Sequence, residues 1–166
     1  KAYRKAVALL AESEFIDIFG VENSLTPAMD LFTKLGYLGL TCRLNTDAYL
    51  QQIGAGHLPH GAVAVAFSHS GSSADTVKAL RLAKSHGAKT IAITNAIGAP
   101  LASWADVTLL TGRDSHTIYG NAIFSRVADT ALVDMLYMGV ILSGYGRFST
   151  ALDESGRMIR DRVFEN

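Results

Sequence analysis

Short apolar runs alternate with segments of helical periodicity along most of this chain. Most of these runs lack polar alternation, as expected of strands that are buried on both faces of a parallel sheet. The runs are Phe15–Phe19, Leu38–Leu44, Val63–Phe67, Thr90–Thr94 and Val107–Leu110. The helical or turn segments are Lys1–Ala11, Pro27–Leu35, Asp47–Ile53, Ala74–Ser85 and Leu101–Trp104. This alternation predicts an α/β three-layer sandwich: a five-stranded parallel sheet with helices on both faces and the flavodoxin-like strand order 2-1-3-4-5.

The last third of the chain has a different pattern. Residues Asn121–Leu142 are apolar on nearly every side, which predicts a helix buried in the core, in an interface between subunits, or in both. Gly144 and Gly146 are expected to break the chain, and Phe148–Phe164 has the pattern of a charged amphipathic helix. We therefore expect a single domain over residues 1–166 that forms a homodimer or a higher homo-oligomer.

Composition narrows the class of protein. A chain of 166 residues, 49% hydrophobic and 18% charged, can form one domain with a sizeable core. Its 15 basic and 15 acidic residues balance, and no run of Lys and Arg marks a nucleic-acid surface. The single cysteine, Cys42, excludes an internal disulfide. Neither a signal peptide nor an apolar span of about 18 residues is present, so we expect a cytoplasmic location without membrane contact.

Polar turns follow two of the predicted strands. The first, Gly20–Ser24, ends in a serine, and the third strand leads into Ser68–Ser73, which holds four serines and Gly71. In the predicted strand order these two strands are neighbours, and their carboxyl ends flank the crevice in which such sheets bind ligands. Serine hydroxyls and the free N–H groups of a first helical turn suit a phosphate monoester. We expect phosphate contacts from Ser24, Ser68, Ser70 and Ser73, with Gly71 allowing close approach or a positive φ.

Helix capping is the alternative role for some of these groups. The sequence Ser72-Ser73-Ala74-Asp75 matches a capping box, so Ser72 could serve only as a cap. Thr26 followed by Pro27 has the pattern of an N-cap with proline at the first helical position. One cap accounts for only one hydroxyl per helix, so capping does not explain Ser68 and Ser70. Ser72 is kept among the candidate ligand-binding residues together with this alternative.

Three segments resemble the SIS (sugar isomerase) domain family. Phe67–Thr94 resembles the core of that family, whose loop pattern is S-x-S-G-x-[ST], and Ile18–Ser24 resembles its first-strand turn, usually G-x-G-x-S. Ser125–Met138 resembles a helix of the SIS domains in RpiR-type bacterial transcription regulators. The resemblance covers about Glu14–Leu142, with the motifs in the expected order.

This resemblance implies the effector domain of a bacterial regulator of sugar or amino-sugar metabolism. Such a domain binds a sugar phosphate, and a helix-turn-helix domain upstream, absent from this chain, contacts DNA. The alternative is an aldose–ketose phosphosugar isomerase, which needs a base near C1 and C2 of the sugar. Glu22, His69 and His116 are the only candidates for that base, and none lies in a motif typical of an isomerase, so we expect no catalytic residue. The sequence indicates neither a metal site nor a cofactor.

One residue departs from the family pattern. Glu22 replaces the second glycine of G-x-G-x-S and Asn23 follows it. The carboxylate could contact sugar hydroxyls, face a partner subunit, or signal a changed ligand, and Asn23 is the residue expected to tolerate a positive φ. Further candidate ligand contacts are His69, Asn95, His116 and Arg126. Arg126 could instead pair with Asp129 or Asp134 along its own helix.

Overall fold

The computed structural model describes residues 1–112 and 126–160, and it confirms the predicted fold class and strand order. All pairings in the five-stranded sheet are parallel, in the order β2-β1-β3-β4-β5. The strands are β1 (Ile16–Phe19), β2 (Cys42–Leu44), β3 (Val63–Phe67), β4 (Lys89–Thr94) and β5 (Val107–Leu110). Since β1 and β3 pair directly, the loops that follow them leave the sheet side by side.

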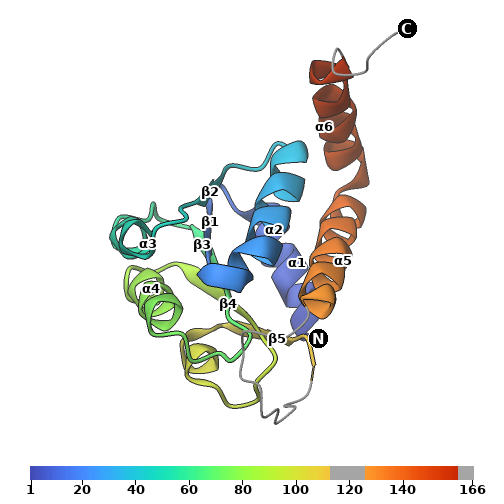
Figure 1. Cartoon of the computed structure of the whole chain (residues 1–166). Coiled ribbons are helices and arrows are strands. Elements are labelled where there is room, and N and C mark those ends of the chain that lie inside the picture. The colour runs from blue at the N-terminus through green and yellow to red at the C-terminus, as the bar shows by residue number, and fades with distance from the viewer. Residues whose placement is uncertain (113–125, 161–166) are drawn as a thin grey trace, which may run out of the picture.

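Helices cover both faces of the sheet (Figure 1). One face packs against α1 (Ala2–Glu12), α2 (Leu25–Tyr37) and α5 (Val127–Ser143). The other face packs against α4 (Ala74–Ser85), with α3 (Ala48–Ala55) beside it. Two short 3₁₀ helices, η1 (Glu22–Ser24) and η2 (Pro100–Trp104), complete the loops after β1 and β4, and α6 (Tyr145–Met158) follows α5.

Side-chain size differs between the two faces, as the central strand β3 illustrates. Val63, Val65 and Phe67 belong to the larger core under α1, α2 and α5. Ala64 and Ala66 alternate with them and belong to the core under α4. Small side chains on that face let α4 lie close to β3. Strand β3 and α4 have the predicted boundaries.

Two glycine-containing stretches differ from the prediction. The second strand was expected over Leu38–Leu44, but Leu38–Leu40 forms a turn, in which Gly39 has a φ of 72°, and only Cys42–Leu44 pairs with β1. The last helix was expected from Phe148, with Gly144 and Gly146 as breaks. Gly146 is helical, because a glycine without positive φ lowers helix stability but does not end a helix.

The end of the chain is bent rather than continuous. The axes of α5 and α6 differ by 116° across Gly144. Val133, Leu136 and Val140 bury one face of α5 in the core, so the all-round apolar pattern corresponds to one buried and one exposed face. Among the described residues no single helix is long and apolar enough to cross a membrane, and the bent pair α5–α6 reaches that length and composition only in combination. Residues 121–125 and 161–164 of the predicted helices lie outside the described residues.

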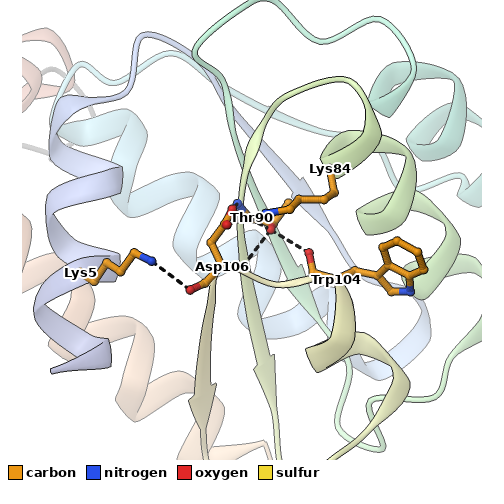
Figure 2. A network of polar contacts seen from close by, with 5 residues as sticks. All are labelled: Lys5, Lys84, Thr90, Trp104 and Asp106. Carbon is orange, nitrogen blue, oxygen red and sulfur yellow. Dashed lines mark hydrogen bonds and ion pairs between the residues drawn. The ribbon is translucent and has the colours of Figure 1, made fainter.

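A polar network holds the amino-terminal end of the sheet together (Figure 2). The Asp106 carboxylate, just before β5, accepts hydrogen bonds from the Thr90 N–H (2.9 Å) and from Lys84 of α4. Lys5 of α1 donates to the Asp106 carbonyl oxygen (3.1 Å), and the Thr90 hydroxyl donates to the Trp104 carbonyl oxygen (2.8 Å). The network ties helices from both faces to β4 and β5, at the opposite end of the sheet from the loops described next.

Candidate functional site

A pocket of about 250 Å³ opens between the loops that follow β1 and β3. Its described lining residues come from the first loop, the second loop, the start of α4 and the residue before α5. They are Val21, Glu22, Asn23, Ser24, Ser68, His69, Ser70, Ser73, Asp75 and Arg126. Ser24 and Ser70, which lie 46 positions apart in the numbering, therefore border the same space. The structure brings together most of the residues predicted as a site.

A buried glutamine shapes the first loop. The Gly20 N–H donates to Oε1 of Gln51 (3.2 Å), and Nε2 of Gln51 donates to the carbonyl oxygens of Gly20 (2.7 Å) and Asn45 (2.8 Å). Gln51 is only 1% exposed, so these bonds are shielded from water. A Cβ at Gly20 would lie 3.0 Å from the Ser24 carbonyl oxygen, which explains a glycine at the end of β1. The chain then turns tightly through η1 and places Ser24 at the N-terminus of α2.

Two largely buried serines present hydroxyls to the pocket. Ser68 is 4% exposed and Ser24 is 9% exposed. Within the described part of the chain, no hydrogen bond engages either hydroxyl, although both serines line the pocket. Each hydroxyl can therefore donate a hydrogen bond to a ligand there. Both serines lie where helix N-termini, those of α2 and α4, bring free N–H groups to the same space.

Of the remaining residues of the second loop, some line the pocket and others determine the conformation of the loop. Ser70 and Ser73 line the pocket, but Gly71 and Ser72 do not. Gly71 has a φ of 63°, and a Cβ there would lie 2.3 Å from the Ala99 Cβ, so glycine is required by the backbone and by the loop beyond β4. Its role is therefore to shape the loop.

Ser72 faces away from the site. It is exposed, its hydroxyl donates to the Ser70 carbonyl oxygen (3.3 Å), and its N–H donates to the Ser70 hydroxyl (3.2 Å). The capping-box interpretation is also wrong, because the N-cap position of α4 is Ser73 and the Asp75 carboxylate accepts from Nε2 of Gln52 (3.0 Å). That register places Ser72 outside the helix.

The first helix of the site also starts earlier than expected. α2 begins at Leu25 with Ser24 at its N-cap position, although the Ser24 side chain makes no capping hydrogen bond. Thr26 is therefore not the cap, and Pro27 is the third residue of the helix. Proline is tolerated there because the first N–H groups of a helix have no partner within it.

The positive φ of the first loop falls on Glu22. Its φ is 51°, and it is the only non-glycine residue with a positive φ among those described. Asn23, which could tolerate this conformation, does not take it; it follows Glu22 in η1 and lines the pocket. The position at which the family pattern has glycine thus requires a positive φ, and in this sequence it is occupied by a residue for which that φ is unfavourable.

A histidine and an arginine form the far side of the pocket. Burial and the nearby Arg126 lower the pKa of His69, outweighing the opposite effect of Asp129, so the imidazole is neutral at pH 7. Asn95 does not line the pocket; its Nδ2 lies 3.4 Å from Nε2 of His69 and helps to orient that ring. Nε of Arg126 lies 3.9 Å from a carboxylate oxygen of Asp129, whereas Asp134 pairs with Lys34 of α2.

One predicted site residue falls outside the described part of the chain, and several residues around the pocket were not predicted. His116 lies outside the described residues. Val21 and Asp75 line the pocket, and Gln51 and Gln52 support it, although none of the four was predicted as a ligand contact. A polar pair in an otherwise apolar helix was the available signal. Within the described ranges, no group of three or more His, Cys, Asp and Glu side chains could hold a metal ion.

Comparison with known families identifies the fold. The sequence model of the SIS domain family matches residues 9–139, which is most of the chain. This chain belongs to the SIS domain family. The predicted resemblance is confirmed, and the two loops of the pocket lie within the matched region.

The curated relatives of this SIS domain are named as transcription regulators. An uncharacterized HTH-type transcriptional regulator of Caldanaerobacter subterraneus subsp. tengcongensis is 31% identical over 98% of this chain and 57% of its own length. The HTH-type transcriptional regulator RpiR of Escherichia coli is 26% identical over 86% of this chain and 48% of its own length. The SIS domain thus spans about half the length of the curated relatives it matches.

Solved structures of low identity share the fold of this SIS domain. The Vibrio vulnificus NanR protein complexed with ManNAc-6P has a TM-score of 0.91 at 24% identity, over 99% of this chain and 62% of that one. The sugar isomerase domain of an RpiR transcription factor from Sphaerobacter thermophilus has a TM-score of 0.83 at 24% identity, over 94% and 86%. A Bacteroides fragilis protein described as a candidate phosphosugar isomerase has a TM-score of 0.73 at 25% identity, over 90% of this chain and 84% of that one.

Proposed function

We propose that this SIS domain is the phosphosugar-binding effector domain of a bacterial transcription regulator that controls sugar or amino-sugar metabolism. The observation that carries the proposal is a pair of serines in the two loops, Ser24 and Ser68, which are buried as residues and line one pocket, and whose hydroxyls have no hydrogen-bond partner among the described residues. Ser70 and Ser73 add two further donors at its edge. A phosphate monoester offers the acceptors that these groups lack.

The names of the relatives support the regulatory part of this proposal. Because the matched region is only about half of each relative and the relatives are called HTH-type regulators, we infer that DNA binding belongs to a separate domain upstream of the SIS domain. A regulator of this type acts in the bacterial cytoplasm. Ligand binding would then be coupled to DNA binding through a difference in affinity for two arrangements of the protein.

Helix α5 is the candidate route for that coupling. Arg126, immediately before α5, borders both the pocket and a shallow groove formed with the exposed side of the helix. Along α5, Met135, Met138 and Leu142 are half exposed or more, an unusual surface for a soluble domain. We infer that this face forms a homodimer or a higher homo-oligomer, so that a ligand at Arg126 shifts the packing of subunits.

Calorimetric titration with hexose and hexosamine phosphates tests the proposed function. Ser68→Ala is expected to weaken binding by about 1.5–3 kcal/mol, roughly tenfold to a hundredfold, because one charge-assisted hydrogen bond is lost. The matched control is Ser72→Ala, in the same loop but outside the pocket, which should retain the affinity. Equal effects of the two variants, or no binding of any sugar phosphate, would contradict the proposal.

An isomerase remains the second candidate, because Glu22 and His69 both line the pocket and a neutral imidazole can accept a proton. Isomerisation through an enediol exchanges the proton at C2 of the sugar with solvent. Proton NMR of the candidate phosphosugars in D₂O, with and without the protein, measures this directly. Exchange at C2 that is lost in His69→Ala would replace the sensor proposal by an enzymatic function, and its absence supports the sensor.

A further inference from the structure

The charges of the pocket do not match those of a phosphate group alone. Among its described lining residues are two carboxylates, Glu22 and Asp75, and one guanidinium, Arg126. Burial and Arg126 lower the pKa of His69, which disfavours a positive charge on its ring. The N-termini of α2 and α4 each contribute about half a positive charge. A phosphate dianion that occupied these helix termini would therefore lie in a small space with carboxylates, which repel it.

Among the described residues, a hydrogen-bond partner is found for only one of the two carboxylates. Asp75 is the second residue of α4, where the helix dipole favours a negative charge, and it accepts a hydrogen bond from Nε2 of Gln52 (3.0 Å). For Glu22, by contrast, no hydrogen bond or ion pair connects the carboxylate to any other described group. It lines the pocket from an exposed position in the middle of the first loop.

The backbone of Glu22 is strained where a glycine would not be. A φ of 51° is unfavourable for a residue with a side chain, and residues in such conformations cluster at active sites, ligand clamps and switch regions. A glycine here would relieve the strain and remove the repulsion of the phosphate. A carboxylate at this position is therefore explained by a positive charge on the ligand itself.

We propose that the ligand of this pocket is a phosphate ester that also carries a free ammonium group, as in a hexosamine phosphate, and that Glu22 binds this ammonium group. The inference rests on the proposed function, since Ser24, Ser68, Ser70 and Ser73 hold the phosphate. A sugar hydroxyl or an N-acetyl group could donate a hydrogen bond to Glu22, but neither offsets its charge. The pocket thus distinguishes amino sugars from neutral sugars by charge.

Titration of the protein with paired ligands tests this inference. Glucosamine 6-phosphate is compared with glucose 6-phosphate and with N-acetylglucosamine 6-phosphate, and mannosamine 6-phosphate with mannose 6-phosphate, at pH 6.5. The free amine should improve affinity about tenfold or more in at least one pair, as one charge-assisted hydrogen bond would. Glu22→Gln should abolish this preference, and so should Glu22→Gly, which also relieves the backbone. Glu14→Gln, at an exposed position outside the pocket, removes the same charge and should retain the preference.

The outcomes separate this inference from the proposed function. A preference for the amino sugar that both Glu22 variants lose supports the inference. Tight binding of the neutral sugar phosphates without any such preference, or a preference that survives in both variants, would overturn it and leave the phosphosugar sensor intact. If no sugar phosphate binds, in any pair, both the inference and the proposed function fail.

Discussion

Substitution of Gly71 by alanine tests how the loop after β3 is held. A Cβ at this position would lie 2.3 Å from the Ala99 Cβ and 2.8 Å from Oγ1 of Thr94, and the φ of 63° is unfavourable for alanine. Gly61 is the matched control, since its φ is 79° and a Cβ there would meet nothing within 4 Å. The two variants share the backbone penalty, and only Gly71→Ala adds a steric clash.

The magnitudes follow from these two contributions. A left-handed alanine costs about 1–2 kcal/mol, of which about 0.4–1 kcal/mol is offset because alanine restricts the unfolded chain. Gly61→Ala should therefore lower the free energy of unfolding by about 0–1.6 kcal/mol. Overpacking adds about 1–3 kcal/mol, so Gly71→Ala should lower it by about 1–4.6 kcal/mol. Ser70 and Ser73 would shift with the loop, and phosphosugar binding should weaken as well.

Urea denaturation followed by circular dichroism measures both variants on the same scale. The decisive quantity is the difference between them, because errors of extrapolation largely cancel. If Gly71→Ala and Gly61→Ala agree within about 0.5 kcal/mol while their m-values equal that of the original protein, the close contact with Ala99 is refuted as a constraint on the loop. Calorimetry of Gly71→Ala with a bound sugar phosphate then shows whether the loop conformation matters for the site.

Three further predictions concern stability. Burial raises the pKa of the Asp106 carboxyl, but hydrogen bonds from Lys84 and Thr90 outweigh this effect, so the pKa is lower than in the unfolded chain. Asp106 therefore stabilises the fold at pH values above its unfolded pKa, and this stabilisation is lost as the pH falls. Asp106→Asn should accordingly flatten the acid side of a curve of unfolding free energy against pH, measured in urea. Glu22→Gly should raise the free energy of unfolding by about 0.5–1 kcal/mol, whereas Glu22→Ala should not, as calorimetric melting would show. Gln51→Leu should lower it by about 2–4 kcal/mol in urea titrations by leaving backbone groups of the first loop unpaired, and a smaller loss would contradict their burial.

The fold was largely predictable because its signals are local. The apolar run Val63–Phe67 and the helical period of Ala74–Ser85 each reflect packing of a single element, and both have the expected boundaries. Errors arose where glycine has more than one role. Gly39 ends the turn before β2, while Gly146 is accommodated inside α6, and the same residue type signals both outcomes.

The candidate site was predictable in place and less so in detail. Loops after adjacent parallel strands must leave the same edge of a sheet, so Ser24 and Ser70 could be expected at one crevice. The residue that holds the first loop in place could not be predicted, because Gln51 reaches that loop from a helix that is distant in sequence. Its hydrogen bonds depend on how α3 packs. Helix register likewise decided that Ser73 lines the pocket and Ser72 does not.

The amino-acid sequence by itself determined the order of elements, the parallel sheet and the two polar loops, because hydrophobic periodicity and turn chemistry act over a few neighbouring residues. Only the tertiary structure decided which serines line one pocket, that Glu22 rather than Asn23 takes the left-handed conformation, and that Arg126 borders the same pocket. These features depend on the positions of segments far apart in the chain, and no local pattern encodes the distance between them.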